Sequence, residues 1–166
     1  MINARQIIEF FQMKPLIPEG GYIKEFHFSD FILDKERLPS FYTCSKSICG
    51  TILYLITKNS FSRMHRLPTD EIYHFYLGDP AEQLQLFKDG AGRIVKLGQD
   101  IMSGEKIQSI APADCWHGTR LVPGGEFALM GTTMAPAYTD GDYQDGVREE
   151  LIGRYPDFAN AITERT

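Results

Sequence analysis

The chain has 166 residues and a mass of 18.9 kDa, which is enough for one domain with a substantial core and short for two. Hydrophobic residues make up 43% of the chain and charged residues 23%, as in an ordinary globular protein. The 17 Lys and Arg residues and 22 Asp and Glu residues give a net charge of −5. This balance argues against binding to nucleic acid or to an anionic membrane, because both require a basic surface.

Neither a membrane anchor nor an export signal is expected from the sequence. The longest apolar stretches, Ser47 to Thr57 and Phe127 to Tyr138, are far shorter than the ~20 residues that span a bilayer. No basic segment followed by an apolar run opens the chain, so we expect no signal peptide. The three cysteines (Cys44, Cys49 and Cys115) are odd in number and lack C-x-x-C spacing, which favours a reducing compartment. We therefore predict a soluble, cytoplasmic protein.

A short helix is predicted over residues 3 to 13. Asn3 is a suitable N-cap, because its side chain can accept a hydrogen bond from a backbone N–H of the first turn. Ile7, Phe10 and Phe11 fall on one face at helical spacing, and Pro15 stops the helix.

From residue 21 to residue 135 the sequence is a series of short predicted β-strands. Runs of apolar and β-branched residues alternate with Gly, Pro, Asp or Asn. Such strands, spaced at roughly ten residues, are typical of an all-β sandwich or barrel. The predicted strands are Gly21–Ser29, Ile48–Thr57, Phe61–Leu67, Glu71–Leu77, Gln83–Phe87, Arg93–Leu97, Ile107–Ala111, Trp116–Val122 and Phe127–Met134.

A helical segment is predicted near the C-terminus, over residues 142 to 163. Val147, Leu151 and Ile152 recur at helical spacing, and Pro156 ends the first helix of the segment. No internal repeat and no linker is visible in the sequence. We therefore predict a single domain over residues 1 to 166, with a β-sandwich or barrel between short terminal helices.

Histidine is rare in this chain and marks the candidate sites for metal binding or acid–base chemistry: His27, His65, His74 and His117. The segment from Asn59 to Gly78 resembles the first motif of the cupin superfamily, Gly-x5-His-x-His-x3–4-Glu-x6-Gly, with His65, Glu71 and Gly78 in place. Asn59 replaces the first Gly, at a position where a left-handed turn residue is expected, and Leu67 replaces the second His. The second motif, Pro-x-Gly-x2-His, is matched by Pro112-Ala-Asp-Cys-Trp-His117, with Asp114 at the Gly position.

Four ordered segments extend this similarity along the chain: Pro18–Tyr22, Phe61–Arg66, Asp70–Pro80 and Arg148–Pro156. Together they resemble cupin family 5, a family of short single-domain cupins classed as a domain of unknown function. The resemblance implies an all-β, cupin-type double-stranded β-helix (a jelly-roll barrel), a homodimer, and a shape related to that of the deoxythymidine-diphosphate-sugar epimerases. It implies no particular reaction.

The resemblance also implies the position of a site. In cupin barrels the first-motif His and Glu and the second-motif His project from neighbouring strands into one end of the barrel, which here gives His65, Glu71 and His117. Two imidazoles and one carboxylate suit non-haem Fe(II) and also Mn, Ni or Zn. Leu67 stands where most metal-holding cupins have a fourth ligand. The alternative is a metal-free pocket whose polar groups bind an organic ligand through hydrogen bonds.

Acid–base catalysis by His65, Glu71 and His117 is a second hypothesis, because an imidazole titrates near neutral pH. The related sugar epimerases use a barrel His to remove a proton next to a carbonyl and a Tyr as the acid, but nothing in this sequence selects one of the eight tyrosines. Arg63 shares strand parity with His65 and is predicted to face the same pocket, where it would bind a carboxylate or phosphate. One arginine is less than the basic set that a nucleotide diphosphate requires.

Three further side chains, Tyr22, Tyr73 and Gln108, are predicted to line the pocket. Tyr73 alternates in phase with Glu71, and Gln108 lies on a strand just before the second motif. We interpret Glu19-Gly20-Gly21 as a glycine turn that leads into a strand, from which Tyr22 or Glu25 reaches the mouth of the pocket.

Four other residues that attract notice are interpreted as structural. His74 alternates out of phase with the pocket residues of its strand, and His27 lies at the end of a strand. Trp116 is interpreted as core or interface, and Cys115 as a buried, inert thiol, because nothing near it in the sequence would lower its pKa.

The predicted function is the binding of a carbohydrate-like or nucleotide-like small molecule inside the barrel. The alternative is a metal-dependent or epimerase-type enzyme that uses His65, Glu71 and His117. A purely structural or storage role would not require a polar pocket, and the clustered His and Glu residues weigh against it.

Overall fold

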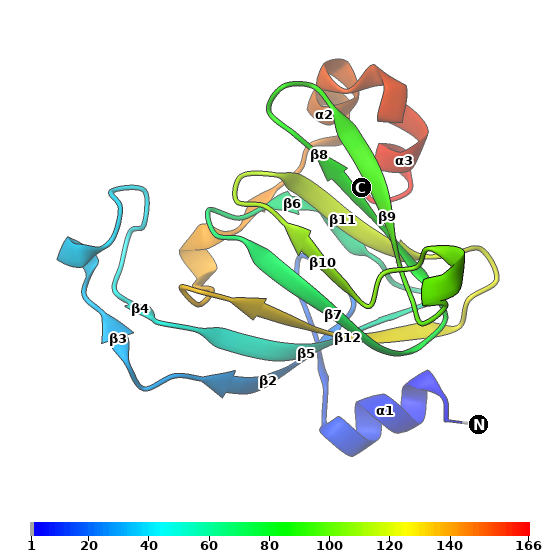
Figure 1. Cartoon of the computed structure of the whole chain (residues 1–166), viewed down its shortest axis with the longest axis horizontal. Helices are drawn as coiled ribbons and strands as arrows, with labels where there is room; N and C mark the ends of the chain where they lie inside the picture. The colour runs from blue at the N-terminus through cyan, green and yellow to red at the C-terminus, as the bar shows by residue number, and fades with distance from the viewer. Residues whose placement is uncertain (1) are drawn as a thin grey trace.

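The computed structural model describes residues 2–166 and shows two facing antiparallel sheets with helices on their outer sides (Figure 1). The fold is the predicted jelly roll. In the six-stranded sheet the order is β1 (Lys14–Pro15), β2 (Tyr22–Phe28), β5 (Gly50–Thr57), β12 (Phe127–Met134), β7 (Glu71–Gly78) and β10 (Gln108–Ala111). In the five-stranded sheet it is β13 (Gln144–Asp145), β6 (Ser62–Arg66), β11 (Trp116–Leu121), β8 (Ala81–Leu86) and β9 (Gly92–Leu97).

The interior of the barrel is filled by the inward-facing residues of the strands. Side chains alternate between the two faces of a strand, so Tyr54 and Ile56 of β5, Tyr73 and Phe75 of β7, and Met130 of β12 all point into the same core. These residues are at most 6% exposed, so their burial is the main source of stability for the barrel.

The outer faces of both sheets are covered by the terminal helices. α1 (Ala4–Phe11) packs Ile7 against Leu55 and Leu129 on the six-stranded sheet. On the five-stranded sheet, Met64 and Leu84 lie beneath the C-terminal helices, α2 (Arg148–Arg154) and α3 (Ala159–Thr163). The middle of each sheet is therefore apolar on its inner face, in the barrel core, and on its outer face, under the helices. Among residues 2–166, no helix combines the length and the apolar character needed to cross a membrane.

The ends of α1 are set by local chemistry. The Asn3 side chain accepts a hydrogen bond from the Gln6 N–H, and the Gln6 side chain accepts one from the Asn3 N–H, which is a complete capping box. Gln12 has a left-handed conformation with φ 53° and ends the helix before Pro15. Pro15 instead belongs to β1.

Short elements complete the chain and shape the mouth of the barrel. An arm formed by β3 (Ile32–Leu33) and β4 (Lys46–Ser47) projects away from the two sheets (Figure 1). Within residues 142 to 163, which we predict to be helical, β13 pairs with β6 before the helices begin. Four 3₁₀ turns are η1 (Lys35–Arg37), η2 (Ile101–Ser103), η3 (Asp140–Asp142) and η4 (Pro156–Phe158).

Candidate functional site

The structure brings His65, Glu71 and His117 together at one end of the barrel interior. His65 on β6 is the direct cross-strand partner of His117 on β11, and their ring centroids lie 4.2 Å apart. Glu71 reaches them from the first position of β7 in the opposite sheet. All three side chains are buried, and one potential ligand atom from each lies within 4.8 Å of the other two.

Both imidazole rings are oriented by main-chain carbonyls. Nδ1 of His65 donates to the carbonyl oxygen of Arg63 at 2.7 Å, and Nδ1 of His117 donates to that of Cys115 at 3.1 Å. With Nδ1 occupied in this way, Nε2 of each ring is the nitrogen directed at the centre of the site. Metal-binding histidines use the same arrangement to fix tautomer and orientation.

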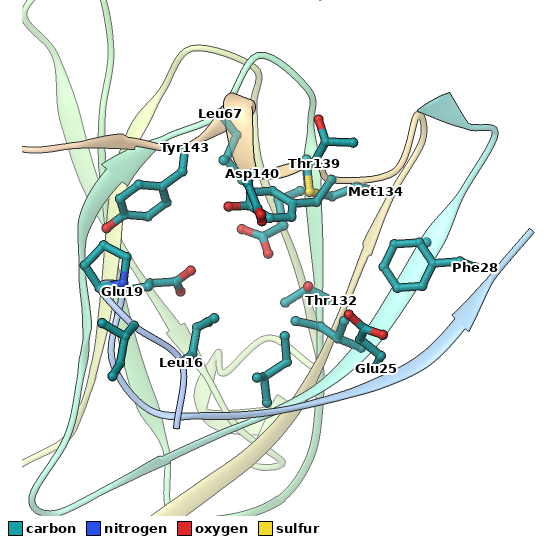
Figure 2. Close-up of a pocket in the computed structure, with 17 residues that line it drawn as sticks. Leu16, Glu19, Glu25, Phe28, Leu67, Thr132, Met134, Thr139, Asp140 and Tyr143 are labelled. Atoms are coloured by element: carbon teal, nitrogen blue, oxygen red, sulfur yellow. The ribbon is translucent and has the colours of Figure 1, made fainter. Parts of the chain in front are cut away.

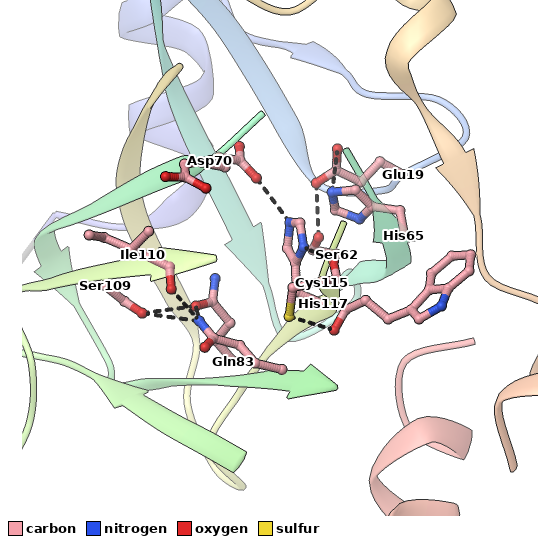
Figure 3. Close-up of polar contacts among 12 residues, drawn as sticks. Glu19, Ser62, His65, Asp70, Gln83, Ser109, Ile110, Cys115 and His117 are labelled. Atoms are coloured by element: carbon pink, nitrogen blue, oxygen red, sulfur yellow. Dashed lines mark hydrogen bonds and ion pairs between the residues drawn. The ribbon is translucent and has the colours of Figure 1, made fainter. Parts of the chain in front are cut away.

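His117 and Glu71 form a buried ion pair, with Nε2 donating to Oε2 at 3.0 Å (Figure 3). Both ring nitrogens of His117 face acceptors, which fits a doubly protonated ring. Burial by itself would lower the pKa of His117, but the hydrogen bond and charge of Glu71 outweigh it and the pKa is raised. Burial likewise opposes ionisation of Glu71, but the hydrogen bond and charge of His117 prevail and its pKa is lowered.

His65 is the neutral member of the site. Burial, followed by the charge of the neighbouring His117, lowers the pKa of His65 to about 3. Its Nδ1 carries the proton that Arg63 accepts, so its Nε2 lone pair is free near neutral pH. A neutral imidazole with this lone pair can act as a metal ligand or as a base.

A second carboxylate, Glu19, enters the site from the loop between β1 and β2. Its Oε1 accepts a hydrogen bond from Ser62 Oγ at 2.8 Å, and its Oε2 lies 3.9 Å from Nε2 of His65 (Figure 3). Burial and the negative charge of Glu71 raise the pKa of Glu19 to about 7. The sequence pattern predicts only a glycine turn for this loop. The signal for Glu19 is that it lies within Pro18–Tyr22, one of the four segments that carry the family resemblance.

A cavity of about 340 Å³ opens beside this cluster (Figure 2). Glu19 and Glu71 line it, whereas His65 and His117 are not part of its wall. Glu25 and Asp140 add two carboxylates at other points of the wall, and no Lys or Arg is found among the lining residues within 2–166. The pocket is therefore acidic, with an apolar part formed by side chains such as Leu16, Leu67, Phe28 and Met134.

The loop that carries Asp140 and Tyr143 is held against the arm by a buried lysine. Lys46 Nζ pairs with Asp142 and donates to Thr139 Oγ1 at 2.8 Å. Tyr143 stacks on His65, with 5.2 Å between ring centroids and 18° between ring planes. This contact places an aromatic ring against one face of the His65 imidazole.

Arg63 does not line the cavity, and the prediction from strand parity is wrong here. The register between β6 and β11 shifts between the pairs His65–His117 and Ser62–Thr119, so a β-bulge interrupts the alternation. Ser62 and His65 consequently both face inward. Nη2 of Arg63 instead lies 3.2 Å from Oδ2 of Asp145 on β13.

Gln108 and Tyr22 also lie outside the cavity. Gln108 Nε2 is 3.1 Å from Nδ1 of His74, on the outer face of the six-stranded sheet. Tyr22 packs on the outer side of that sheet, in the apolar cluster beneath α1. Of the two residues that we expect at the mouth of the pocket, Tyr22 and Glu25, only Glu25 lines the cavity.

Tyr73 lies inside the barrel but not on the cavity wall. Its ring is edge-on to His117 at 6.1 Å, and its buried hydroxyl has no hydrogen-bond partner among residues 2–166. Burial raises its pKa well above the ordinary value, with the charge of Glu71 as the next cause. The hydroxyl is therefore protonated and available as a donor.

A second buried polar cluster lies below His117 (Figure 3). Gln85, the cross-strand partner of His117, donates to Gln83 Oε1 at 2.7 Å, and Ser109 Oγ donates to the same oxygen at 3.0 Å. Gln108, which we predict to line the pocket, and Ser109 both lie on β10. Of these two neighbours, Ser109 is the residue that faces inward.

The residues interpreted as structural lie away from the cavity. His27 is exposed, and His74 lies 3.2 Å from Thr133 Oγ1 on the outer sheet face. Trp116 packs against the core beneath the C-terminal helices. Cys115 is buried, and burial raises its pKa to about 11.

The two motif positions where Gly is usual behave differently. Asp114 adopts the left-handed conformation with φ 61°, so this aspartate takes over the role of the motif glycine. Asn59 is not among the residues with positive φ, so the prediction of a left-handed residue there is wrong. Its N–H donates to Thr57 Oγ1 at 3.3 Å in an ordinary turn.

Two solved structures match essentially the whole chain. A protein from Shewanella oneidensis has a TM-score of 0.88 and 24% identity, with 100% of this chain and 98% of that one covered. A hypothetical protein from Leishmania major has a TM-score of 0.88 and 25% identity, with 99% of each chain covered. Neither name states an activity.

Oxalate decarboxylase from Bacillus subtilis shares the fold at a greater distance. One of its structures has a TM-score of 0.54 and 12% identity, with 95% of this chain and 38% of that one covered. The description of another structure of the same enzyme refers to its Mn(II) centres. No curated protein sequence gives a significant match to this chain.

Sequence comparison agrees with the fold and with the two motifs. The family described as Cupin superfamily (DUF985) matches residues 5–145, which include His65, Glu71 and His117. The chain therefore belongs to this cupin family.

Proposed function

We propose that this protein binds a divalent metal ion through His65, Glu71 and His117 and binds a small hydroxyl-rich molecule, such as a carbohydrate, in the adjacent cavity. The observation that carries the proposal is the convergence of three buried donors within 4.8 Å of one another.

The three donors fit a metal ion in chemistry and in spacing. Ligand atoms at about 2.1 Å from one ion lie about 3.0 to 3.4 Å apart in octahedral or tetrahedral geometry. Donor atoms that lie within 4.8 Å of one another therefore need to move together by at most about 2 Å. Both imidazoles already direct Nε2 inward, because their Nδ1 atoms are held by carbonyls at 2.7 and 3.1 Å. Two histidines and one carboxylate suit Fe(II), Mn or Zn.

A divalent ion in this position would supply a Lewis acid that polarises a carbonyl or hydroxyl oxygen of the bound molecule. The protein's own residues have separate tasks. His65 is neutral and ready to bind, whereas His117 must release its Nε2 proton and exchange its hydrogen bond to Glu71 for the ion. Binding should therefore release a proton from His117.

The charge of the cavity favours a hydroxyl-rich ligand over a nucleotide. The cavity is lined by four carboxylates, those of Glu19, Glu25, Glu71 and Asp140. Among residues 2–166, no Lys or Arg contributes to its wall. A diphosphate would meet repulsion on every side, whereas sugar hydroxyls donate hydrogen bonds to carboxylates. The volume of about 340 Å³ is at the small end of the range for small-molecule pockets.

Metal analysis of the untagged protein by mass spectrometry tests the proposal. We expect near-stoichiometric Fe, Mn, Ni or Zn in the wild-type protein and its loss in His65→Ala and His117→Ala. His27→Ala is the matched control, because it removes an exposed histidine outside the site. Absence of bound metal after deliberate loading with each of these ions would refute the proposal.

A second candidate function is epimerase-type proton transfer without a metal. The observation that favours it is the neutral His65 ring stacked on Tyr143 at 5.2 Å, which juxtaposes a base and a protonated phenol. Burial raises the pKa of Tyr143, so its hydroxyl can donate a proton. Solvent deuterium that enters a sugar in metal-free protein, and no longer enters in His65→Ala, would support this function over the first.

The biological setting is part of the same proposal. A cytoplasmic location and a homodimer are expected from the sequence and from the family resemblance. The acidic balance of the chain, with a net charge of −5, is consistent with a small-molecule partner and with no nucleic-acid partner.

A further inference from the structure

We propose that Glu19 is the fourth protein ligand of this metal site and replaces the histidine that the cupin motif usually has at Leu67. This inference rests on the proposed metal function and extends it to a residue outside both motifs. Leu67 lines the cavity with a side chain that has no donor atom, so the first motif alone leaves the site one ligand short.

The Glu19 carboxylate lies at the correct place for this role. Its Oε2 is 3.9 Å from Nε2 of His65, the nitrogen directed into the site. Its Oε1 accepts from Ser62 Oγ at 2.8 Å, which leaves Oε2 as the free oxygen on the side of His65. The side chain is only 17% exposed, so this carboxylate belongs to the interior rather than to the surface.

The loop that carries Glu19 is fixed by contacts with the barrel. The Glu19 carbonyl accepts from the Arg63 N–H at 2.8 Å, and the Gly20 carbonyl accepts from Tyr54 Oη–H at 2.9 Å. Gly20 has φ +100°, and a Cβ there would lie 2.3 Å from the Phe61 carbonyl oxygen. The backbone thus passes β6 so closely that only glycine fits, and this approach sets the position of the carboxylate.

The charge balance of the site supports the same assignment. Glu19 and Glu71 are two carboxylates in one buried site, and His65 and His117 bind a metal as neutral rings. A divalent cation would therefore make the set of four ligands electrically neutral. Without a cation, the two carboxylates lie in one site, and no Lys or Arg among residues 2–166 lines the cavity wall to balance their charge.

The experiment compares metal affinity in Glu19→Gln and in Glu25→Gln by competition with a chromophoric chelator, with Mn²⁺ and Co²⁺ as the probes. Gln at position 19 keeps the shape and the acceptor for Ser62 but removes the charge. Glu25 lines the far side of the same cavity, next to Phe28 (Figure 2), so its substitution matches the loss of charge without the loss of a ligand. We expect the affinity to fall about 100-fold or more in Glu19→Gln, since even outer-shell partners of metal ligands are worth 10–100-fold. In Glu25→Gln we expect a change of less than about threefold, because water screens an exposed charge.

Two further measurements distinguish ligation from a general electrostatic effect. The visible absorption spectrum of the Co²⁺ form should change in Glu19→Gln, since the ligand set changes, and should be unchanged in Glu25→Gln. In the double variant Glu19→Gln/Leu67→His, the usual cupin histidine is restored, and the affinity should recover by at least about tenfold over Glu19→Gln.

The outcomes separate this inference from the proposed function. If wild-type protein binds none of these metals, the proposed metal function fails and Glu19 cannot be a ligand. If wild-type protein binds metal, but Glu19→Gln and Glu25→Gln have equal affinities and unchanged Co²⁺ spectra, the metal function stands and the assignment of Glu19 is wrong.

Discussion

Replacing Glu19 by Gln should stabilise the metal-free protein, and the gain should grow with pH. The reason is that the carboxylate of Glu19 is buried next to Glu71, which raises its pKa from 4.5 to about 7. In the unfolded chain this group loses its proton near pH 4.5. In the folded protein it keeps the proton until about pH 7, so the folded state is increasingly disfavoured as pH rises through this window.

The magnitude follows from the two pKa values. Each pKa unit corresponds to about 1.4 kcal/mol, so raising the pKa from 4.5 to about 7 costs the ionised protein about 3 kcal/mol above pH 8. Gln carries no charge at any pH and still accepts from Ser62 Oγ. We therefore expect Glu19→Gln to equal the wild-type protein near pH 4.5 and to exceed it by about 3 kcal/mol at pH 8.

Urea unfolding in the presence of a chelator, repeated from pH 4.5 to pH 8.5, measures this difference. Titratable groups remote from residue 19 are present in both proteins and cancel in the comparison, whereas the response of Glu71 and His117, which interact with Glu19, is part of the measured difference. Glu25→Gln is the control and should show no comparable gain. A Glu19→Gln protein that is less stable than wild type at pH 8, or a difference that does not change with pH, would refute the argument that Glu19 is a buried charge without a cation.

Three other predictions concern the loop, the thiols and the assembly. Gly20→Ala should cost about 2 kcal/mol or more in urea unfolding, because its Cβ would lie 2.3 Å from the Phe61 carbonyl oxygen; a neutral result would show that the loop moves freely. Cys115 is buried with a pKa of about 11, so iodoacetamide at neutral pH should label the exposed Cys44 much faster, as peptide mass spectrometry would show; equal rates would contradict the burial. Light scattering should give twice the monomer mass of 18.9 kDa, and a monomer at all concentrations would exclude the expected homodimer.

Most of the fold could be predicted from local sequence patterns. Every predicted strand between residues 21 and 135 overlaps an observed one, because Gly, Pro, Asp and Asn mark the turns of this chain clearly. The two motifs predicted His65, Glu71 and His117, since the first motif spans the consecutive strands β6 and β7 and the second spans a turn and the start of β11. Spacing along the sequence is sufficient where the residues lie on one strand or on two consecutive strands.

The remaining residues could not be predicted because they depend on contacts between strands. Simple alternation predicts that Arg63 faces the pocket, but a β-bulge opposite β11 interrupts the alternation. Closeness to the second motif favours Gln108, but the register of β10 against β7 puts Ser109 on the inner face. Glu19 lies 46 residues before His65 in the chain, and only the close passage of its loop along β6 makes them neighbours.

The position of Glu19 connects the function of the site to its cost in stability. A carboxylate that served only to hold the loop would be more favourable as an amide, because Ser62, its hydrogen-bond donor, could satisfy either group. An acidic group at this position in the metal-free protein opposes folding increasingly as pH rises from 4.5 to about 7, and a bound divalent cation reverses the sign of that contribution. Glu19→Gln should therefore be more stable than wild type in chelator and less stable than wild type at saturating Mn²⁺. A divalent cation bound next to the carboxylate produces this crossing, whereas general screening by monovalent salt does not.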